Sequence, residues 1–381
     1  MNFSLSEEQT LLQDSIARYV RDHCGVDRHR ARLDEPPGCD VQAWQQFAEL
    51  GWLSIPFDEE FGGFGGGAVD LMVTSEAFGR GIVREPFLGT VVTCGSFLRL
   101  GGTPDQHAAH IPSIIDGSKR WAFAFAEFDS GYDLAAVSTS AFAQGAGYLL
   151  NGSKHAVVDG HDADFLIVTA RTSGADRNRG GISLFIVDAK QDGVVRKNFS
   201  RVDGGMGAHI TLENVIVAEE SQLGTPGQAY PLMQDVIDVS IVAMGAEALG
   251  IMQVLLDTTV EYTKTRKQFG QPIGKFQALQ HRMADMYLKV EETRSLVFNA
   301  AIAVDAGSNE AATACAALKV KIGEAGKYVS QQAVQLHGGI GMTDELVIGH
   351  HFKRLMVLAM LYGDEDYYLE RYVELSRLEA G

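Results

Sequence analysis

The sequence has 381 residues, of which 46% are hydrophobic and 21% charged, and this is the composition of a globular protein with a large core. Its length predicts two or three domains, or one large composite fold. The formal net charge of −17 argues against nucleic acid as a partner, because a phosphate backbone would be repelled.

Cysteine usage and the N-terminal composition both favour a reducing compartment. Residues 1–20 lack the basic segment and the apolar segment of a secretory signal. No uninterrupted apolar run approaches the length of a membrane span. No CxxC pair occurs, so neither a zinc site nor a disulfide framework is predicted from the four cysteines, Cys24, Cys39, Cys94 and Cys315. We therefore expect a cytoplasmic protein without a membrane partner.

A helical domain is predicted over residues 1–117. Ser6 is a candidate N-cap, and acidic residues follow it. Apolar residues recur at helical spacing over 41–55 and again over 70–82. The glycine-rich stretch 58–70 predicts a plain loop, because no Lys-Ser/Thr follows it and no strand precedes it, as a phosphate-binding loop would require.

An antiparallel β domain is predicted over residues 118–225. Short segments rich in β-branched and aromatic residues are separated there by turn residues. Asn151-Gly152 stands between "YLL" and "KHAVV". This dipeptide favours the type I′ turn of a hairpin, which needs positive φ at both central residues. We therefore predict a hairpin at this point.

A four-helix bundle is predicted over residues 226–381. Helical periodicity with few breaks covers 226–266, 275–306, 311–336 and 344–376. Long helices joined by short connections form a bundle. No Glu-x-x-His motif occurs, so we expect neither a di-iron centre nor any other metal site. The predicted fold class is α+β, in the order all-α, antiparallel β and all-α.

Three stretches carry a resemblance to a known family. They are "YTKTRKQFGQPIGKFQALQHRMADM" (262–286), "QLHGGIGMTDELVIGHHFKRL" (335–355) and "GYLLNGSKHAVVDGHDADFLIV" (147–168). With the α–β–α order, they resemble the acyl-CoA dehydrogenase family over essentially the whole chain. The resemblance implies FAD between the β domain and the bundle, an acyl-CoA substrate and an electron-transfer flavoprotein as acceptor. In that family a carboxylate removes the α-proton while the β-hydrogen leaves as hydride to the flavin.

The resemblance further implies a surface that holds the dinucleotide end of a neighbouring subunit's FAD. A guanidinium can pair bidentately with phosphate oxygens, and glycines let the backbone approach a ligand closely. The alternative is local: an arginine that complements its own helix dipole, and a glycine turn between two helices. The residues that match the family surface are Arg266, Gln268, Phe269, Gln335, His337, Gly338 and Gly339.

The segments that would face this chain's own flavin ring depart from the family pattern. Where the family reads Thr-Glu-Pro-Gly-x-Gly-Ser, this chain reads "AEFDSGY", with Ala126 at the threonine position and Tyr132 at the serine position. Where the family reads Trp-Ile-Thr, this chain has Ala156, Val157 and Val158. The side chains expected against the ring are therefore missing, although backbone amides remain, and Tyr132 is bulky where the CoA arm would pass.

The catalytic carboxylate is missing from both positions where the family carries it. Gly363 stands where most members have a glutamate after a tyrosine, and Ser240, followed by Ile241, stands at the alternative position on the first long helix. A positioned general base contributes about 10²- to 10⁴-fold in rate. Asp364 is the candidate for a displaced base, although one residue is a rotation of about 100° around a helix, so it also fits a solvated acidic face. Gly363 itself fits a helix C-cap.

Three hypotheses remain open. We favour a non-catalytic subunit of a heteromeric, α2β2, FAD-dependent acyl-CoA dehydrogenase, whose Arg266, Gln335, Gly338 and Gly339 complete the flavin site of a homologous partner. The second is a self-sufficient homo-oligomeric enzyme with Asp364 as the base. The third is a flavin-free scaffold of the same fold.

Overall fold

The computed structural model describes residues 5–34 and 39–380, and the chain divides into two compact units. We call the first the helical unit; it consists of Met1–Pro36, Ala68–Val83 and Ile241–Gly381. We call the second the sheet unit; it consists of Pro37–Gly67 and Arg84–Ser240. Each unit combines segments that are far apart in the sequence. The three contiguous ranges 1–117, 118–225 and 226–381 stay a prediction as domains, although helices, strands and helices follow one another in that order.

The N-terminal helices of the helical unit are α1 (Glu7–His23), α2 (Val26–Asp34) and α4 (Ala68–Gly81). The N-cap prediction is confirmed: the Ser6 hydroxyl accepts from the Gln9 amide at 3.1 Å, and the Gln9 side chain accepts from the Ser6 amide at 3.0 Å. The carboxylate of Asp305 accepts from the first amides of α4, those of Ala68 and Val69. A side chain more than two hundred residues away thus fixes where α4 begins. The sequence-based description of residues 1–4 lies outside the described residues.

Short helices precede the strands of the sheet unit. The glycine-rich stretch 58–70, predicted as a loop, is a loop over most of its length, but it contains a 3₁₀ turn over Glu59–Phe61, and its last three residues begin α4 at Ala68. A π-helix, Phe87–Cys94, was not predicted; the hydroxyl of its Thr90 bonds to the backbone of Trp121, where the first strand begins. The remaining helices are α3 (Val41–Glu49), the 3₁₀ segment Trp52–Ser54, α5 (Gly95–Gly101) and α6 (Pro104–Ile115).

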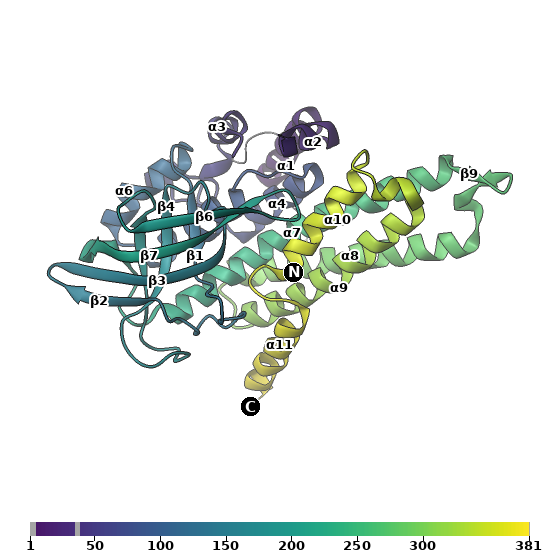
Figure 1. Cartoon of the computed structure of the whole chain (residues 1–381). Coiled ribbons are helices and arrows are strands. Elements are labelled where there is room, and N and C mark those ends of the chain that lie inside the picture. The colour runs from purple at the N-terminus through teal and green to yellow at the C-terminus, as the bar shows by residue number, and fades with distance from the viewer. Residues whose placement is uncertain (1–4, 35–38, 381) are drawn as a thin grey trace. The chain divides into compact units, whose positions relative to one another are not determined.

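Eight strands form one twisted sheet in the order β6-β7-β3-β2-β4-β5-β8, with β1 paired to β4 (Figure 1). The strands are β1 (Trp121–Ala124), β2 (Ser140–Gln144), β3 (Gly147–Val158), β4 (Phe165–Arg171), β5 (Ile182–Asp188), β6 (Val194–Ser200), β7 (Met206–Ala218) and β8 (Gln222–Leu223). The α+β class is confirmed, but the sheet is mixed, because β1 and β2 pair with β4 in parallel. Long connections separate these strands in sequence, and only long connections allow parallel pairing.

The predicted hairpin at Asn151-Gly152 is wrong. Both residues lie inside the continuous strand β3, at a register shift against β7 between Leu150 and Gly152. Strand β3 is paired on both edges, to β2 and β7. At the register shift Asn151 opposes two residues of β7, so β7 carries the extra residue as a bulge, with Asn214 at a φ of +55°. Asn151 stabilises the bulge by accepting from the amide of Asn214 at 2.8 Å. A glycine is needed because Gly152 has a φ of +152°, and an added Cβ would lie 2.5 Å from the hydroxyl of Thr139.

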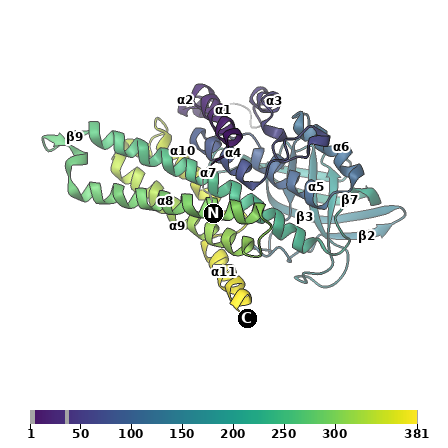
Figure 2. The same ribbon diagram turned by 180° about the vertical axis from the view of Figure 1, so that it is seen from behind.

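The bundle of the helical unit is built from the end of α7 (Ala229–Thr265) together with α8 (Gln277–Asp305), α9 (Ala311–His337) and α10 (Val347–Met360), and α11 (Glu365–Ala380) packs against α9 (Figures 1 and 2). The four-helix bundle is confirmed. The single helix predicted over 344–376 is wrong, because the backbone turns between Met360 and Glu365, where Tyr362 and Gly363 have φ values of +60° and +137°.

Helix α7 corrects one sequence-based expectation. By length and composition it is apolar enough to cross a membrane, which the search for uninterrupted apolar runs did not reveal. However, 83% of its most apolar window is buried inside the protein. The apolarity of α7 is therefore that of a core helix, since its side chains are covered by the protein itself.

Candidate functional site

Two of the family-like motif segments lie at one end of the bundle. A short antiparallel hairpin of β9 (Lys267–Gln268) and β10 (Gln271–Pro272) follows α7 and lies at the outer end of the long helices (Figure 1). Phe269 and Gly270 form its turn, both with positive φ. The Phe269 ring is 91% exposed. A bulky residue in this conformation costs free energy, so the turn displays an aromatic ring to solvent against the local preference.

Arg266 lies between the end of α7 and this hairpin. Its backbone is held at both sides, since its amide donates to the Tyr262 carbonyl and its carbonyl accepts from the Ile273 amide, each at 2.8 Å. Its side chain is exposed and forms no ion pair with any residue that the structure describes. Gln268 is exposed beside it on β9. The backbone of Arg266 is thus held in place, and its guanidinium is available to an anion.

The other motif segment is the C-terminal turn of α9. Its His337 is buried, and its ring stacks on that of Tyr262 with centroids 4.4 Å apart. This contact joins the last turn of α7 to the last turn of α9, so it brings the two motifs together. The His337 Nδ1 lies 2.8 Å from the Ala333 carbonyl, while its Nε2 is buried without a hydrogen-bond partner among the described residues. Burial lowers the pKa of His337, which favours the neutral imidazole. Gln335, two residues earlier, is exposed.

Gly338 and Gly339 open the 3₁₀ turn Gly338–Met342, which follows α9. Gly338 has φ +65° and ψ −141°, a conformation that strongly favours glycine. No atom lies within 4 Å of an added Cβ at either glycine. The backbone here is open to close approach by a ligand. We refer to Arg266, Gln268, Phe269, Gln335, Gly338 and Gly339, the exposed residues of the two motifs, as the wing.

The wing fits the phosphate-bearing end of FAD. It offers an unengaged guanidinium, an open glycine backbone, a side-chain amide and an exposed aromatic ring, which are the groups that bind phosphates and a planar base. Bound flavin would supply a hydride acceptor. The sequence did not reveal the contribution of Tyr262, although its place four residues before Arg266 on a helix puts both on related faces.

The segment 126–132, predicted to face a flavin ring, is held by a buried ion pair, but Ala126 and Tyr132 stand where the family has a threonine and a serine. Lys154 is fully buried, and its Nζ lies 2.7 Å from the Glu127 carboxylate and 2.8 Å from the Thr169 hydroxyl. Burial would raise the pKa of Glu127, but Lys154 and Ser138 lower it to about 2. Burial lowers the pKa of Lys154 to about 8, against the attraction of Glu127. The pair is structural, and the side chain of Ala126 offers no hydrogen bond to a ring.

The side chains of Ala156, Val157 and Val158 on β3 differ from the Trp-Ile-Thr of the family. Ala156 is exposed with φ +52°. Its amide lies 3.4 Å from Nδ1 of His209, whose ring lies 4.2 Å from that of His155. Val157 is buried. The side chains of Ala156, Val157 and Val158 therefore present neither an aromatic ring nor a hydroxyl to a flavin.

A groove of about 850 Å³, including its open side, runs beside segment 126–132. Exposed Asp129 and Asp176 line it together with Arg177, which is itself paired with Asp133 at 3.1 Å. This balance of charges does not attract phosphates. The other lining residues are Glu127, Phe128, Ser130, Ala136, Val137, Ser138 and Ser153.

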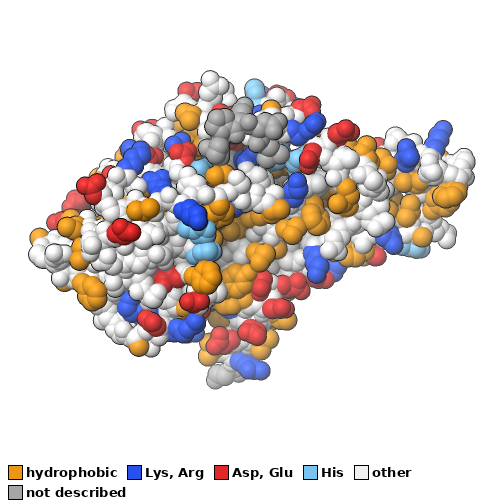
Figure 3. All heavy atoms as spheres, viewed as in Figure 1, with side chains coloured by type: hydrophobic (Ala, Val, Ile, Leu, Met, Phe, Trp, Pro, Cys, Tyr) orange, Lys and Arg blue, Asp and Glu red, His pale blue; other side chains and the backbone are white. Residues whose placement is uncertain are grey.

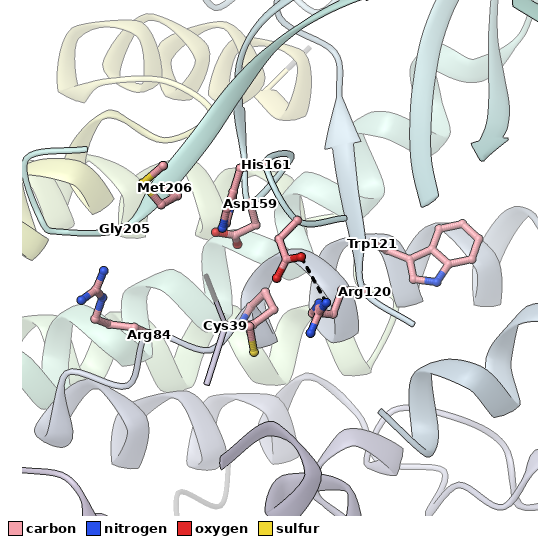
Figure 4. A pocket seen from close by; sticks show the side chains of 10 residues that line it. Cys39, Arg84, Arg120, Trp121, Asp159, His161, Gly205 and Met206 are labelled. Carbon is pink, nitrogen blue, oxygen red and sulfur yellow. Dashed lines mark hydrogen bonds and ion pairs between the residues drawn. The ribbon is translucent and has the colours of Figure 1, made fainter. Parts of the chain in front are cut away.

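A second, more enclosed pocket of about 430 Å³, including its open side, lies elsewhere in the sheet unit (Figure 4). Arg120, paired with Asp162 at 3.2 Å, lies on one side, and Cys39 and His161 lie nearby. Burial raises the pKa of Cys39 to about 12. Its thiol is therefore protonated, and it is not a nucleophile.

Gly363, at the vacated base position, lies in the turn between α10 and α11. It is not the C-cap of α10, which is Leu361. With a φ of +137°, an added Cβ at Gly363 would lie 2.4 Å from the Tyr368 ring and 2.7 Å from that of Tyr367. A glutamate at this position would therefore be strained and would displace the rings of Tyr367 and Tyr368.

A buried lysine of α9 stabilises the end of α10 just before this turn. Lys319 is fully buried, and its Nζ donates to the carbonyls of Leu358 and Ala359, both at 2.8 Å, at the end of α10. Burial lowers the pKa of Lys319 to about 7, against the attraction of Asp364. Asp364, the displaced-base candidate, accepts from the Tyr367 amide at 3.0 Å and so caps α11. Sequence reasoning missed Lys319, because a single lysine in a helical repeat does not reveal its burial.

Ser240, at the alternative base position, is fully buried in the sheet unit. Its hydroxyl donates to the Val236 carbonyl at 2.8 Å and lies 2.9 Å from the hydroxyl of Thr93. Ile241 is also buried. A hydroxyl held by its own helix cannot replace a carboxylate base.

Comparisons with known proteins agree with this fold. Residues 6–118, 122–215 and 230–374 match the N-terminal, middle and C-terminal domain models of acyl-CoA dehydrogenase. A curated relative, the probable acyl-CoA dehydrogenase YngJ of Bacillus subtilis (strain 168), is 31% identical over 91% of each chain.

Two similar solved structures have names that join two proteins. The steroid ACAD Tcur3481-Tcur3483 is 31% identical with a TM-score of 0.89 over 99% of each chain. The ChsE4-ChsE5 complex of Mycobacterium tuberculosis is 26% identical with a TM-score of 0.89 over 98% of each chain. The domain matches cover most of the sequence in the family order, and the chain belongs to the acyl-CoA dehydrogenase family.

Proposed function

We propose that this chain is the non-catalytic subunit of a heteromeric, FAD-dependent acyl-CoA dehydrogenase and completes the flavin site of a homologous subunit. The observation that carries the proposal is the turn at Gly363, where the positive φ and the rings of Tyr367 and Tyr368 disfavour a side chain at the position of the base. A chain that carried out α,β-desaturation alone would need a carboxylate there or on α7, and Ser240 offers none. The complete enzyme takes an acyl-CoA substrate, passes electrons to an electron-transfer flavoprotein and is cytoplasmic.

The wing supports the binding part of the proposal. Arg266, Gly338 and Gly339 have the exposure and open backbone that a dinucleotide requires, while Ala126 and Val158 lack the side chains that would hold a flavin ring. A chain that completes the flavin site of a partner is expected to retain the wing and to lose the side chains that would hold a flavin ring of its own. The two similar structures whose names join two proteins are consistent with such a pairing.

The test is flavin content measured with and without the partner. The chain is purified alone and together with a homologue that retains the glutamate, and both absorption spectra are recorded. We expect flavin only in the complex, with bleaching on addition of acyl-CoA. Stoichiometric flavin and bleaching in the lone chain would contradict the proposal.

Substitution of Arg266 distinguishes the hypothesis that the wing binds flavin from the hypothesis of a flavin-free scaffold. We expect Arg266→Ala to release flavin from the complex, because a charge-assisted phosphate contact is lost. Lys267→Ala, at the exposed neighbouring position on β9, is the matched control and should retain flavin. Colourless protein in every combination of subunits would instead favour the flavin-free scaffold.

Asp364→Asn tests the self-sufficient alternative. A capping aspartate can be replaced by asparagine with little loss, because both accept from the same amide. We therefore expect unchanged turnover in the complex. Loss of activity with flavin retained would identify Asp364 as a displaced base.

A further inference from the structure

Three histidines of the helical unit form a buried cluster. His29 of α2 lies with its ring centroid 4.7 Å from that of His350 on α10, in an edge-to-face arrangement. His351 is the next residue of α10. The exposed fractions of the three residues are 5%, 2% and 0%. Neither ring nitrogen of His351 has a hydrogen-bond partner among the described residues.

The neighbouring charges do not compensate a positive charge on His351. The charged groups that act on it are His29 and His350, both of which disfavour a further proton. On α10 itself, Lys353 is paired with the Asp344 carboxylate at 3.5 Å, and Arg354 is paired with Glu247 of α7. On the adjoining helix α9, Lys319 bonds to the carbonyls at the end of α10. A protonated His351 would thus be an uncompensated buried charge.

The cluster is connected to the wing through His350. Its Nε2 lies 3.1 Å from the Asp344 carbonyl, in the segment that joins the turn Gly338–Met342 to α10. The contact of His350 with His29 also holds α2 against α10. A change in the cluster therefore acts at once on the docking of α2 and on the base of the loop that presents Gly338 and Gly339.

We propose that His29, His350 and His351 form an acid-sensitive latch that holds α2 and the base of the glycine loop on α10 at neutral pH and releases them on acidification. This inference rests on the proposed function only in so far as the loop holds flavin. The latch itself is a property of the lone chain.

The direction of the pH effect follows from burial. Burial, together with His29 and His350, lowers the pKa of His351 to about 3, against 6.5 for a free imidazole. Between these values the unfolded chain binds a proton that the folded chain does not. The contribution of His351 to stability is complete above pH 6.5 and is lost as the pH falls toward 3. One such proton changes the unfolding equilibrium by about tenfold per pH unit.

The experiment is denaturant unfolding of the full chain between pH 7.5 and 4.5. His351→Leu should remove up to about tenfold per pH unit of the acid-induced rise in the unfolding constant. His281→Leu is the matched control, because His281 is exposed on α8, and it should keep the full pH dependence. Equal pH slopes for wild type and His351→Leu would overturn the proposal.

A second measurement does not depend on the variant folding. Selective ¹⁵N-histidine labelling of the wild type should show His351 still neutral at pH 5. The hydrogen-exchange protection of α2, corrected for the pH dependence of intrinsic amide exchange, should fall as the pH falls. A His351 signal that titrates near pH 6.5, or protection in α2 that is independent of pH, would refute the latch.

The flavin readout distinguishes this inference from the proposed function. In the complex, wild type should lose flavin at a higher pH than His351→Leu. If the complex holds no flavin at any pH, the proposed function fails, and the latch is decided by unfolding and exchange alone. If flavin is held equally by both proteins down to pH 4.5, the coupling to the loop is refuted.

Discussion

At the scale of single residues, Gly363 is more than the absence of a glutamate. Tyr362 and Gly363 both adopt positive φ, and the rings of Tyr367 and Tyr368 fill the space that a Cβ would need. Gly363 thus lies in a turn whose conformation favours glycine. The sequence shows that the carboxylate is missing, but it cannot show that this turn also disfavours a side chain at the same position.

We expect Gly363→Glu to lower stability without creating dehydrogenase activity. The unfavourable φ costs about 1–3 kcal/mol, and overlap with Tyr368 adds to this. Urea unfolding measures the loss, and flavin bleaching by acyl-CoA measures activity. Gly180→Glu is the matched control, since Gly180 has an ordinary φ and no atom within 4 Å of an added Cβ. Full stability with activity in Gly363→Glu would show that the turn adapts readily.

At the scale of elements, the strand β3 shows which features local sequence patterns predict and which they do not. The sequence predicts the existence and type of the long bundle helices and of most strands, because apolar periodicity is a local property. It misplaces the hairpin, because Asn-Gly is a local turn signal, whereas Asn151 and Gly152 lie in a continuous strand opposite a bulge of β7, and only pairing with both β2 and β7 decides between the two structures. Similarly, helical periodicity runs through Leu361–Asp364, although the chain turns there.

The bulge itself can be tested with Gly152→Ala. We expect a loss of about 1–3 kcal/mol, because an alanine is strained at this φ, and its Cβ would overlap with Thr139. Thermal and urea unfolding measure the change. Gly180→Ala serves as control, and similar stability of both variants would mean that the strand can slip into an unbulged register.

The candidate site was also predictable only in part, because apolar periodicity is a local property and does not show which distant residues come together. Arg266, Gln335, Gly338 and Gly339 lie together at one end of the bundle, and their grouping is visible in the sequence through the resemblance alone. Tyr262, Lys319 and the histidine cluster are recognisable only once helices are packed, because burial of a lysine or histidine depends on neighbours that are distant in sequence.

At the scale of the whole molecule, the bundle leaves apolar side chains uncovered. Apolar atoms gather along the outside of its helices (Figure 3). Met342, Met356 and Met360 are 75%, 47% and 60% exposed, together with the ring of Phe269 at the wing. Contiguous exposed apolar surface is typical of a protein that associates, and thioether side chains adapt readily to a partner surface.

Oxidative footprinting of the methionines tests this surface. In the lone chain, we expect Met342 and Met360 to be oxidised rapidly, because their sulfur atoms are accessible. Binding of the homologous subunit should protect them severalfold. Met244 and Met252, both fully buried, are internal controls and should stay reduced in both samples. Unchanged oxidation of all four on mixing would argue that the partner does not cover the bundle.

The division of the chain has a consequence for its synthesis on the ribosome. The helices α1, α2 and α4 belong to the unit that is completed by residues 241–381, so their apolar faces emerge roughly 200 residues before the helices that cover them. At about 5–20 residues per second, this interval lasts about 10–40 s. We expect the nascent N-terminal helices to bind chaperones during that time, whereas the sheet unit can fold once its last segment, which ends at Ser240, has been made.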